Sequence, residues 1–509
     1  MNAMSPLGIT AETLALAKAA LAEGMNSQQA LAKNIDIATG LTAYDLQAPA
    51  KNLYPPITPL RNSMPRVSRV NPGDAARWRS IFAITGSGYD SMPWIPEGQR
   101  SASMSYNAVP QVAPYLTLGE EDTITFEAES AAVGFEDVNA TATMRLLQKM
   151  MRKEEQGILG GNSSLQLGVP NAPTLSASGT GGTLPALTPY SVIVVCLTRD
   201  GWALSALGAQ GIATTKVITG NDGNQYTLYG GSSMKSASAT QNVTLGQTLF
   251  AQLTTPPQGT FAYAWFVGAV GSETLQAITT INSVAISAPL LSGQMPATAI
   301  TQDCSANPAL AFDGLMTVAA KPANAAYYSA LPTGTAGTGS FLTPSGRGSV
   351  VEIDNMFISM WNNYRLSPTV MYVNVQEQKN ITAKCLTNAS GPLLRYNMDA
   401  DSQGGYNVGA GGVVRWYSNP FSVDGGTEIP IKVHPDIPPG TILAYAERLP
   451  TWYQSNEVNN PFEIMLRRDY YRIDWPIRTR RREYGVYAEE TLACYAPFSA
   501  GLITNIANG

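Results

Sequence analysis

The residues that could perform catalysis are few in this sequence. His434, within "KVHPDIPPG", is the only histidine, which excludes a two-histidine HExxH zinc site. No GxSxG element offers a serine nucleophile, which counts against a hydrolase. Two interpretations of His434 are considered: a catalytic histidine of a hydrolase, and a structural imidazole that precedes a turn. The structural imidazole is the interpretation that we favour, because histidines of that kind are far commoner than catalytic ones.

Metal and phosphate sites are similarly unsupported. "DADSQGG", from Asp399, resembles the start of an EF-hand loop, but Ala410 stands where a bidentate Glu is needed. The glycine-rich segments "GNDGNQYTLYGGSS" and "GTAGTGSFLTPSGRGS" lack the GxxxxGK[ST] spacing of a phosphate loop. The four cysteines have no CxxC spacing and are predicted to be reduced and buried. We therefore expect no catalytic residue, no metal site and no cofactor.

Charge is concentrated in a few segments, although only 14% of the residues are charged. "MRKEEQGILGG" places Glu154 and Glu155 near the end of an expected helix, where the macrodipole disfavours anions by a few tenths of a kcal/mol each. "RRDYYRIDWPIRTRRREYG" interleaves arginines with acids and aromatics. Because the acids nearly balance the arginines, this pattern favours pairing with protein over stacking on nucleic acid. "TPLRNSMPRVSRV" is extended by its prolines and rich in arginine.

The composition indicates a globular protein of several domains. With 509 residues the chain is too long for one core. A net charge of -5 argues against a protein that coats nucleic acid with a broad basic face. No run of 18 apolar residues predicts a membrane span, and the first residues predict an amphipathic helix rather than a signal peptide, so we expect assembly in the cytoplasm.

A projecting β-hairpin and a long helix are predicted in the first third of the chain. "SIFAIT" and "TITFEAE" flank a turn-rich loop, which suggests a hairpin over about 80–125. A helix follows over about 137–160 and would be roughly 30 Å long. Asp137 or Asn139 can cap its start, and Gly160 with Gly161 can end it. Its predicted core stripe consists of Met144, Leu147, Met151 and Ile158.

Residues 168–300 differ in composition from the rest. They contain six charged residues, Arg199, Asp200, Lys216, Asp222, Lys235 and Glu273. Short apolar strands recur between turns, which predicts an immunoglobulin-like or fibronectin type III β-sandwich with Trp265 in its core. Cys196 has no partner within these residues, so an immunoglobulin disulfide is excluded and the match is to a sandwich in general. From residue 301 onward a helix, a strand and a helix are expected, and "YYRIDWPIR" is expected to pair with "YGVYAEETLACYAP".

The order of these parts resembles the major capsid proteins of tailed bacteriophages, which have the HK97-type fold. The segments that carry the resemblance are "TPLRNSMPRV", the hairpin loop, "EEQGILGGN", "IPIKVHPDIPPGTILAYAER" and "YGVYAEETLACYAPFSAGLITNI". The resemblance implies an α+β fold with an inserted all-β sandwich. It divides the chain into an N-terminal arm (1–57), a peripheral part (58–167), the insertion (168–300), a mainly axial domain (301–450) and C-terminal strands that return to the peripheral and axial core (451–509). The peripheral part contains the extended loop (about 80–125) and the spine helix (about 137–160).

The function implied by the resemblance is self-assembly into an icosahedral shell around phage DNA, with no enzymatic activity. Hexamers and pentamers of the chain itself are the expected assembly, located in the virion and formed in the host cytoplasm. Scaffold, portal and decoration proteins are further expected partners, double-stranded DNA is contacted non-specifically, and no membrane is involved. An encapsulin-like compartment shell and a phage tail or adhesion protein remain alternatives.

The expected contacts between subunits follow from the charge pattern. We predict that Glu154 and Glu155 either remain solvated or meet arginines from another copy, and the candidate donors are Arg61, Arg66, Arg69, Arg478, Arg480, Arg481 and Arg482. Some family members form a Lys–Asn crosslink from a lysine in the extended loop. Residues 80–125 contain no lysine, so that crosslink is predicted to be absent here. The short N-terminal arm suggests a separate scaffold protein or none.

Overall fold

The computed structural model describes residues 57–508, except for 69–72, 87–91, 93, 134–136, 180, 221–222, 347, 388–394, 398–406, 410–412, 423–424 and 454–457. The loop that resembles an EF-hand, from Asp399, and the candidate donor Arg69 lie outside the described residues. The fold class is α+β, as predicted from the sequence.

The chain forms two compact units, Met1–Pro55 with Phe126–Ala140 and Pro56–Thr125 with Thr141–Gly509. The described part of the first unit contains α4 (Phe126–Ala132) and the start of α5 (Val138–Gly160). The carboxylate of Asp137 accepts a hydrogen bond from Ala140 N at 3.1 Å and so caps α5. Of the two predicted caps, Asp137 therefore has this role, and α5 ends at Gly160 as expected.

Helix α5 buries a different stripe from the one predicted. Its buried apolar positions include Leu146 and Met150, whereas Met144 is 60% exposed and Leu147 is 39% exposed. Of the predicted stripe, only Ile158 lies in the core. The helix carries two apolar stripes on different faces, and periodicity cannot choose between them because each has helical spacing. The sheet against which the helix packs makes that choice.

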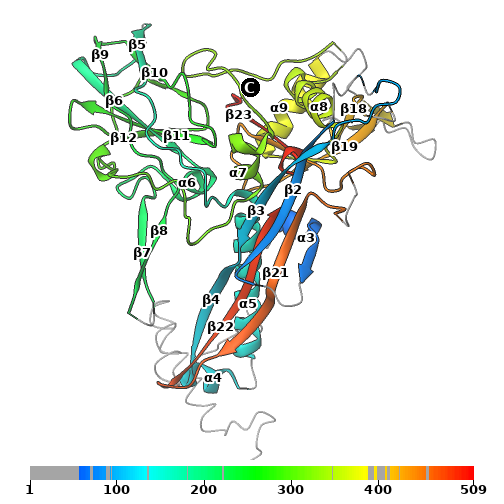
Figure 1. Ribbon diagram of the computed structural model, residues 1–509. Coiled ribbons are helices and arrows are strands. Elements are labelled where there is room, and N and C mark those ends of the chain that lie inside the picture. The colour runs from blue at the N-terminus through cyan, green and yellow to red at the C-terminus, as the bar shows by residue number, and fades with distance from the viewer. Residues whose placement is uncertain are drawn as a thin grey trace, which may run out of the picture. The chain divides into compact units, whose positions relative to one another are not determined.

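A four-stranded sheet lies along α5 (Figure 1). Its order is β1 (Arg66–Ser68), β21 (Phe462–Asp474), β22 (Arg481–Cys494) and β4 (Leu116–Thr125). Arg472 on β21 donates to Thr143 Oγ1 on α5 at 2.9 Å, and Lys153 on α5 pairs with Glu120 on β4. The antiparallel pairing of β21 with β22 confirms the predicted pairing of the two C-terminal segments.

The hairpin consists of β2 (Ala75–Thr85) and β3 (Ser105–Pro114), which form a separate two-stranded sheet. Tyr115 N donates to Asp74 O at 3.2 Å and closes its root. The predicted second strand, "TITFEAE", was wrong: its first residues belong to β4, which pairs with β22, and helix α4 begins at Phe126. Strand β3, strand β4 and helix α4 follow one another closely here, and the partner of each strand shows that β3, not β4, completes the hairpin.

The larger mixed sheet has the order β14-β23-β20-β15-β19-β18 and is packed against helices. Its strands are β14 (Tyr327–Ala330), β15 (Val370–Val373), β18 (Trp416–Asn419), β19 (Thr427–Val433), β20 (Ile442–Tyr445) and β23 (Ala500–Thr504). The associated helices are α7 (Leu315–Ala320), α8 (Val351–Tyr364) and α9 (Val375–Thr387). A small two-stranded sheet joins β16 (Arg395–Asn397) to β17 (Asn407–Gly409). The predicted helix, strand and helix correspond to α8, β15 and α9.

Residues 174–286 form two antiparallel sheets around one core. One sheet has the order β13-β10-β5 and the other β12-β11-β6-β9. The strands are β5 (Thr174–Ser178), β6 (Leu187–Leu197), β9 (Ala239–Val243), β10 (Thr248–Gln252), β11 (Ala262–Ala269), β12 (Thr274–Thr279) and β13 (Ser283–Ile286). Trp265 is fully buried in this core, as predicted, and Cys196 is a free, buried thiol. Helix α6 (Arg199–Leu204) and a hairpin of β7 (Thr215–Thr219) and β8 (Gln225–Tyr229) complete the region.

Candidate interaction surfaces

The two glutamates near the end of α5 are buried and occupied within their own chain. Glu155 accepts hydrogen bonds from Leu60 N at 2.9 Å and from Arg61 N at 2.7 Å. These amides belong to α3 (Pro59–Ser63), whose first-turn N–H groups have no partner within the helix. Glu155 therefore holds the segment that leads into β1 against the end of α5.

Glu154 is 1% exposed and is surrounded by donors. It accepts from Arg61 Nε at 2.6 Å, from Arg66 Nη1 and from the hydroxyl of Tyr470. Burial, together with the neighbouring Glu154, raises the pKa of Tyr470, which keeps this hydroxyl protonated and able to donate. Two guanidinium groups thus offset the cost of an anion at the end of α5.

The arginines that contact Glu154 belong to the same chain, whereas the sequence analysis predicted that they would come from another copy. Residues 59–68 run past the end of α5, which brings Arg61 and Arg66, 93 and 88 positions away in the sequence, to within hydrogen-bond distance of Glu154. The alternative of solvated glutamates is also excluded, because both carboxylates are buried.

His434 completes this cluster. Its Nε2 lies 2.8 Å from Glu155 Oε1, and its Nδ1 accepts a hydrogen bond from Asp436 N at 3.1 Å. Because Nδ1 is the acceptor, Nε2 carries the proton that is donated to the carboxylate. Both ring nitrogens are therefore engaged, and neither is available to activate a serine. This arrangement matches the structural imidazole favoured from the sequence.

Glu490, on β22, lies beside this cluster, and sequence reasoning had not assigned it a role. Its Oε2 is 3.4 Å from Arg66 Nη2, whereas Oε1 is buried without a hydrogen-bond partner among the described residues. Burial, and then the charge of Glu154, raise the pKa of this carboxyl group. The alternation of side chains along β22 places Glu490 on the buried face of the strand. The sequence shows this alternation, but which of the two faces is buried depends on the elements that pack against the strand.

Glu377 on α9 is another buried carboxylate, and its hydrogen-bond partners among the described residues are neutral groups. It accepts from Gly440 N at 3.0 Å and from the side chains of Asn380 and Gln376 at 3.3 Å each. Burial raises its pKa to about 7. The contact joins α9 to the turn between β19 and β20, which also receives a hydrogen bond from Ile506 N at Gly440 O.

The sandwich is attached to the end of α5 by one buried arginine. Arg199 Nε donates to Asp436 O at 3.1 Å, and its Nη2 lies 3.6 Å from the carboxylate of Asp436. Asp436 is also 3.5 Å from Arg152 on α5. Gly160 leaves the space for this arginine, because a Cβ there would lie 2.7 Å from Arg199 Cδ. Arg199 and Gly160 therefore fit each other as a pair.

The hairpin of β2 and β3 exposes an unusual amount of apolar surface. Large hydrophobic side chains are exposed along both strands and at the described part of the tip: Ile81, Ile84, Met92, Trp94, Ile95, Met104, Tyr106, Val109 and Val112. The root packs on the body, where Ala76 and Trp78 join a small cluster with Met465 and Ala493. Contiguous exposed apolar surface of this kind marks an interaction site.

The four candidate arginines between β21 and β22 are all exposed. Arg478, Arg480, Arg481 and Arg482 lie at the turn or the first residues of β22. Arg481 Nε pairs with Glu483 at 2.9 Å. The structure does not bring these arginines to Glu154 or Glu155. They form an exposed basic turn, next to the exposed side chains of Trp475 and Ile477.

Within the described ranges, no three His, Cys, Asp or Glu side chains are grouped as metal ligands. None of the helices in the described part of the chain combines the length and the hydropathy needed to cross a membrane.

Comparison with known proteins places this chain near several shell structures, at low similarity. No family model and no curated protein matches the sequence. The capsid of a native GTA particle is 10% identical, with a TM-score of 0.41 over 93% of this chain and 98% of that one. The capsid of cyanophage P-SCSP1u is 8% identical, with a TM-score of 0.40 over 93% and 94%. The SrpI encapsulin of Synechococcus elongatus is 8% identical, with a TM-score of 0.38 over 92% and 94%. At these values the resemblance carries no functional argument by itself.

Proposed function

We propose that this chain is a major capsid protein, a tile that assembles with copies of itself into the icosahedral head of a tailed bacteriophage. Hexamers and pentamers are the assembly units, and no catalytic step is involved. The shell encloses double-stranded DNA and forms in the host cytoplasm. Portal, scaffold or decoration proteins are further partners of such a shell.

The β2–β3 hairpin is the observation that carries this proposal. A two-stranded sheet is marginally stable in water without further packing. Beyond its root this hairpin has exposed apolar side chains on both strands, including Ile84 on β2 and its partner Tyr106 on β3. Burying them on neighbouring copies would stabilise both the hairpin and the contact. Repeated around symmetry axes, many modest contacts of this kind close into a shell.

The exposed basic turn supplies a second contact between copies in this proposal. Arg478, Arg480, Arg481 and Arg482 project from a chain whose net charge is -5, so the rest of each copy is more negative than the total. A carboxylate-rich surface on a neighbouring copy is therefore the complementary partner. The negative net charge also fits a shell that confines DNA without gripping it.

The test uses the full chain. Wild-type protein is expected to form closed particles by negative-stain microscopy, and Ile84→Asp is expected to abolish them while the melting temperature of the dissociated monomer stays unchanged. Val217→Asp is the matched control, because Val217 is an exposed β-branched residue on the separate β7–β8 hairpin. A wild-type chain that stays monomeric at high concentration would overturn the proposal.

The molecules enclosed in the particles distinguish a phage capsid from an encapsulin-like shell. Nuclease-protected double-stranded DNA inside particles from the natural source supports a phage capsid. Particles that lack DNA and hold a co-purifying enzyme support a compartment shell instead. Tubes or fibres rather than closed particles would support the tail or adhesion alternative.

A further inference from the structure

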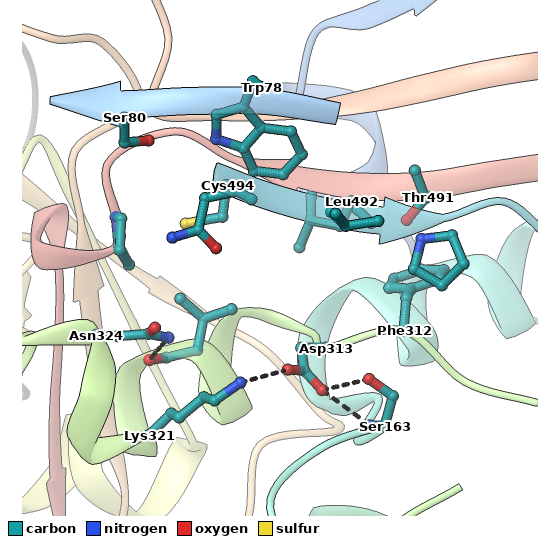
Figure 2. Close-up of a pocket in the computed structure, with 16 residues that line it drawn as sticks. Trp78, Ser80, Ser163, Phe312, Asp313, Lys321, Asn324, Thr491, Leu492 and Cys494 are labelled. Carbon is teal, nitrogen blue, oxygen red and sulfur yellow. Dashed lines mark hydrogen bonds and ion pairs between the residues drawn. The ribbon is translucent and has the colours of Figure 1, made fainter. Parts of the chain in front are cut away.

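A cavity of about 130 Å³ lies at the root of the hairpin, between β2 and β3 on one side and the region of α7 on the other (Figure 2). Trp78, Val112, Phe312 and Leu492 form apolar parts of its wall, and polar groups line the rest. An engineered apolar cavity of about 150 Å³ is large enough to bind benzene. The root cavity therefore has space for much of an aromatic side chain.

The rim of this cavity is polar and charged. Asp313 Oδ1 accepts from the backbone N and the hydroxyl of Ser163, both at 2.8 Å, and Lys321 Nζ lies 3.6 Å from Asp313 Oδ2 (Figure 2). Lys321 remains one-third exposed. Trp78 Nε1, on the opposite side, is buried and has no hydrogen-bond partner among the described residues. An incoming backbone carbonyl would satisfy that donor.

The hairpin tip carries a side chain that fits this cavity. Trp94 is 87% exposed, more than any other large hydrophobic residue of the described ranges, and Ile95 follows it. Glu97 lies three positions further, within about 10 Å of Trp94, and so can approach a cation at the cavity rim. An indole exposed to this extent gains substantially from burial, since aromatic side chains bury 150–250 Å² each.

Trp94 does not occupy the cavity of its own chain. Ser80 lines the cavity and β2 continues to Thr85, paired with Ser105. Five residues of paired strand carry the tip about 17 Å away from the root. The occupant that the geometry favours is therefore the tip of a second copy.

We propose that Trp94 of one copy inserts into the root cavity of a neighbouring copy, with Glu97 beside Lys321 at the rim. This inference rests on the proposed function and deepens it, because it names the surface that receives the hairpin tip. Each hairpin then links two copies: its tip enters one neighbour, and its root receives the tip of another. Such a head-to-tail contact closes into a ring where the rotation between successive copies returns to the first copy.

Disulfide crosslinking tests the contact directly. Ser80→Cys with Ile95→Cys in one chain is expected to give a ladder of covalently joined chains when assembled particles are oxidised and run on a denaturing gel. All of these variants also carry Cys494→Ser, because the native Cys494 thiol lines the same cavity. Each single variant is then expected to stay monomeric, as is Ser80→Cys with Met104→Cys, because Met104 directly precedes β3 and follows Trp94 by ten positions in the sequence. Assembled particles that show no ladder, or an equal ladder in the Met104 pair, would overturn the insertion.

A second measurement keeps the inference testable if the cysteine variants do not assemble. Trp94→Ala is expected to lower the denaturant concentration at which particles dissociate, by more than Met104→Ala does. Equal midpoints for the two variants would contradict the insertion. If wild-type chains form no particles, the proposed function fails. If wild-type particles form and both tests are negative, only the insertion fails.

Discussion

At the scale of single residues, the most informative groups are the buried carboxylates. Glu154, Glu155 and Glu377 all lie in or near helices and are all shielded from water, yet they are satisfied in different ways. Glu154 is held by guanidinium groups, Glu155 by helix amides and an imidazole, and Glu377 by neutral donors only. A carboxylate with neutral donors retains its proton more easily than one beside a cation.

Glu377 should make the stability of the chain depend on pH. Its pKa is about 7 in the folded chain against 4.5 for the free group. Between these values the folded chain holds a proton that the unfolded chain releases, so the free energy of unfolding falls as pH rises from 4.5 through 7. The total change attributable to this group is about 3 kcal/mol. Urea denaturation between pH 4 and 8 is expected to show a smaller decline for Glu377→Gln than for wild type.

Glu447→Gln is the control for that experiment, because Glu447 is partly exposed and pairs with Lys432 at 3.7 Å. An undiminished decline in Glu377→Gln would mean that another group causes the pH dependence.

Glu154→Gln tests whether the arginine pairs form within one chain. Removing one partner of a buried pair costs about 3–5 kcal/mol, because the remaining charges stay buried without compensation. The loss is expected in urea denaturation of the dissociated monomer, since Arg61 and Arg66 belong to the same chain. Asp469→Asn, which removes an exposed partner of Arg66, is expected to cost less than about 1 kcal/mol. If Glu154→Gln is as stable as the wild-type monomer but fails to assemble, the result would contradict pairing within one chain and support pairing between copies.

At the scale of elements, the boundaries of several helices and strands and the pairing of the two C-terminal strands could be predicted, but other neighbours could not. Helix α5 ends at Gly160, and strands β21 and β22 pair as expected. The choice of buried stripe on α5 and the partner of β4 were predicted wrongly. Both depend on which surface packs against the element, and local periodicity contains no information about that surface.

The junction between α5 and the sandwich depends on a glycine. Gly160→Ala would place a Cβ 2.7 Å from Arg199 Cδ, so the arginine must move out of a buried site. We expect a loss of about 1–3 kcal/mol in the free energy of unfolding, measured by denaturant titration. Gly346→Ala is the matched control, because a Cβ there meets no atom within 4 Å. Equal stability of the two variants would show that Arg199 adjusts without cost.

At the scale of the whole molecule, the proposed shell depends on non-covalent contacts. Residues 80–125 contain no lysine, so the hairpin cannot supply an amine for an isopeptide crosslink. Wild-type particles boiled in denaturant are expected to run as monomers on a gel. A ladder from unmodified wild-type particles would reveal a covalent link from another part of the chain.

The sequence by itself determined the α+β class, the low-charge sandwich region with Trp265 at its core, the long helix and the scarcity of catalytic groups. These features follow from local sequence pattern and composition, which can be analysed without knowledge of tertiary contacts. Only the tertiary structure decided where the carboxylates of α5 find their partners, because Arg61 and Arg66 lie 93 and 88 positions from Glu154 in the sequence. It also decided that the hairpin has a cavity at its root, since that space is lined by residues from five separate segments of the sequence. Contacts of this kind arise from packing, which a single sequence does not display.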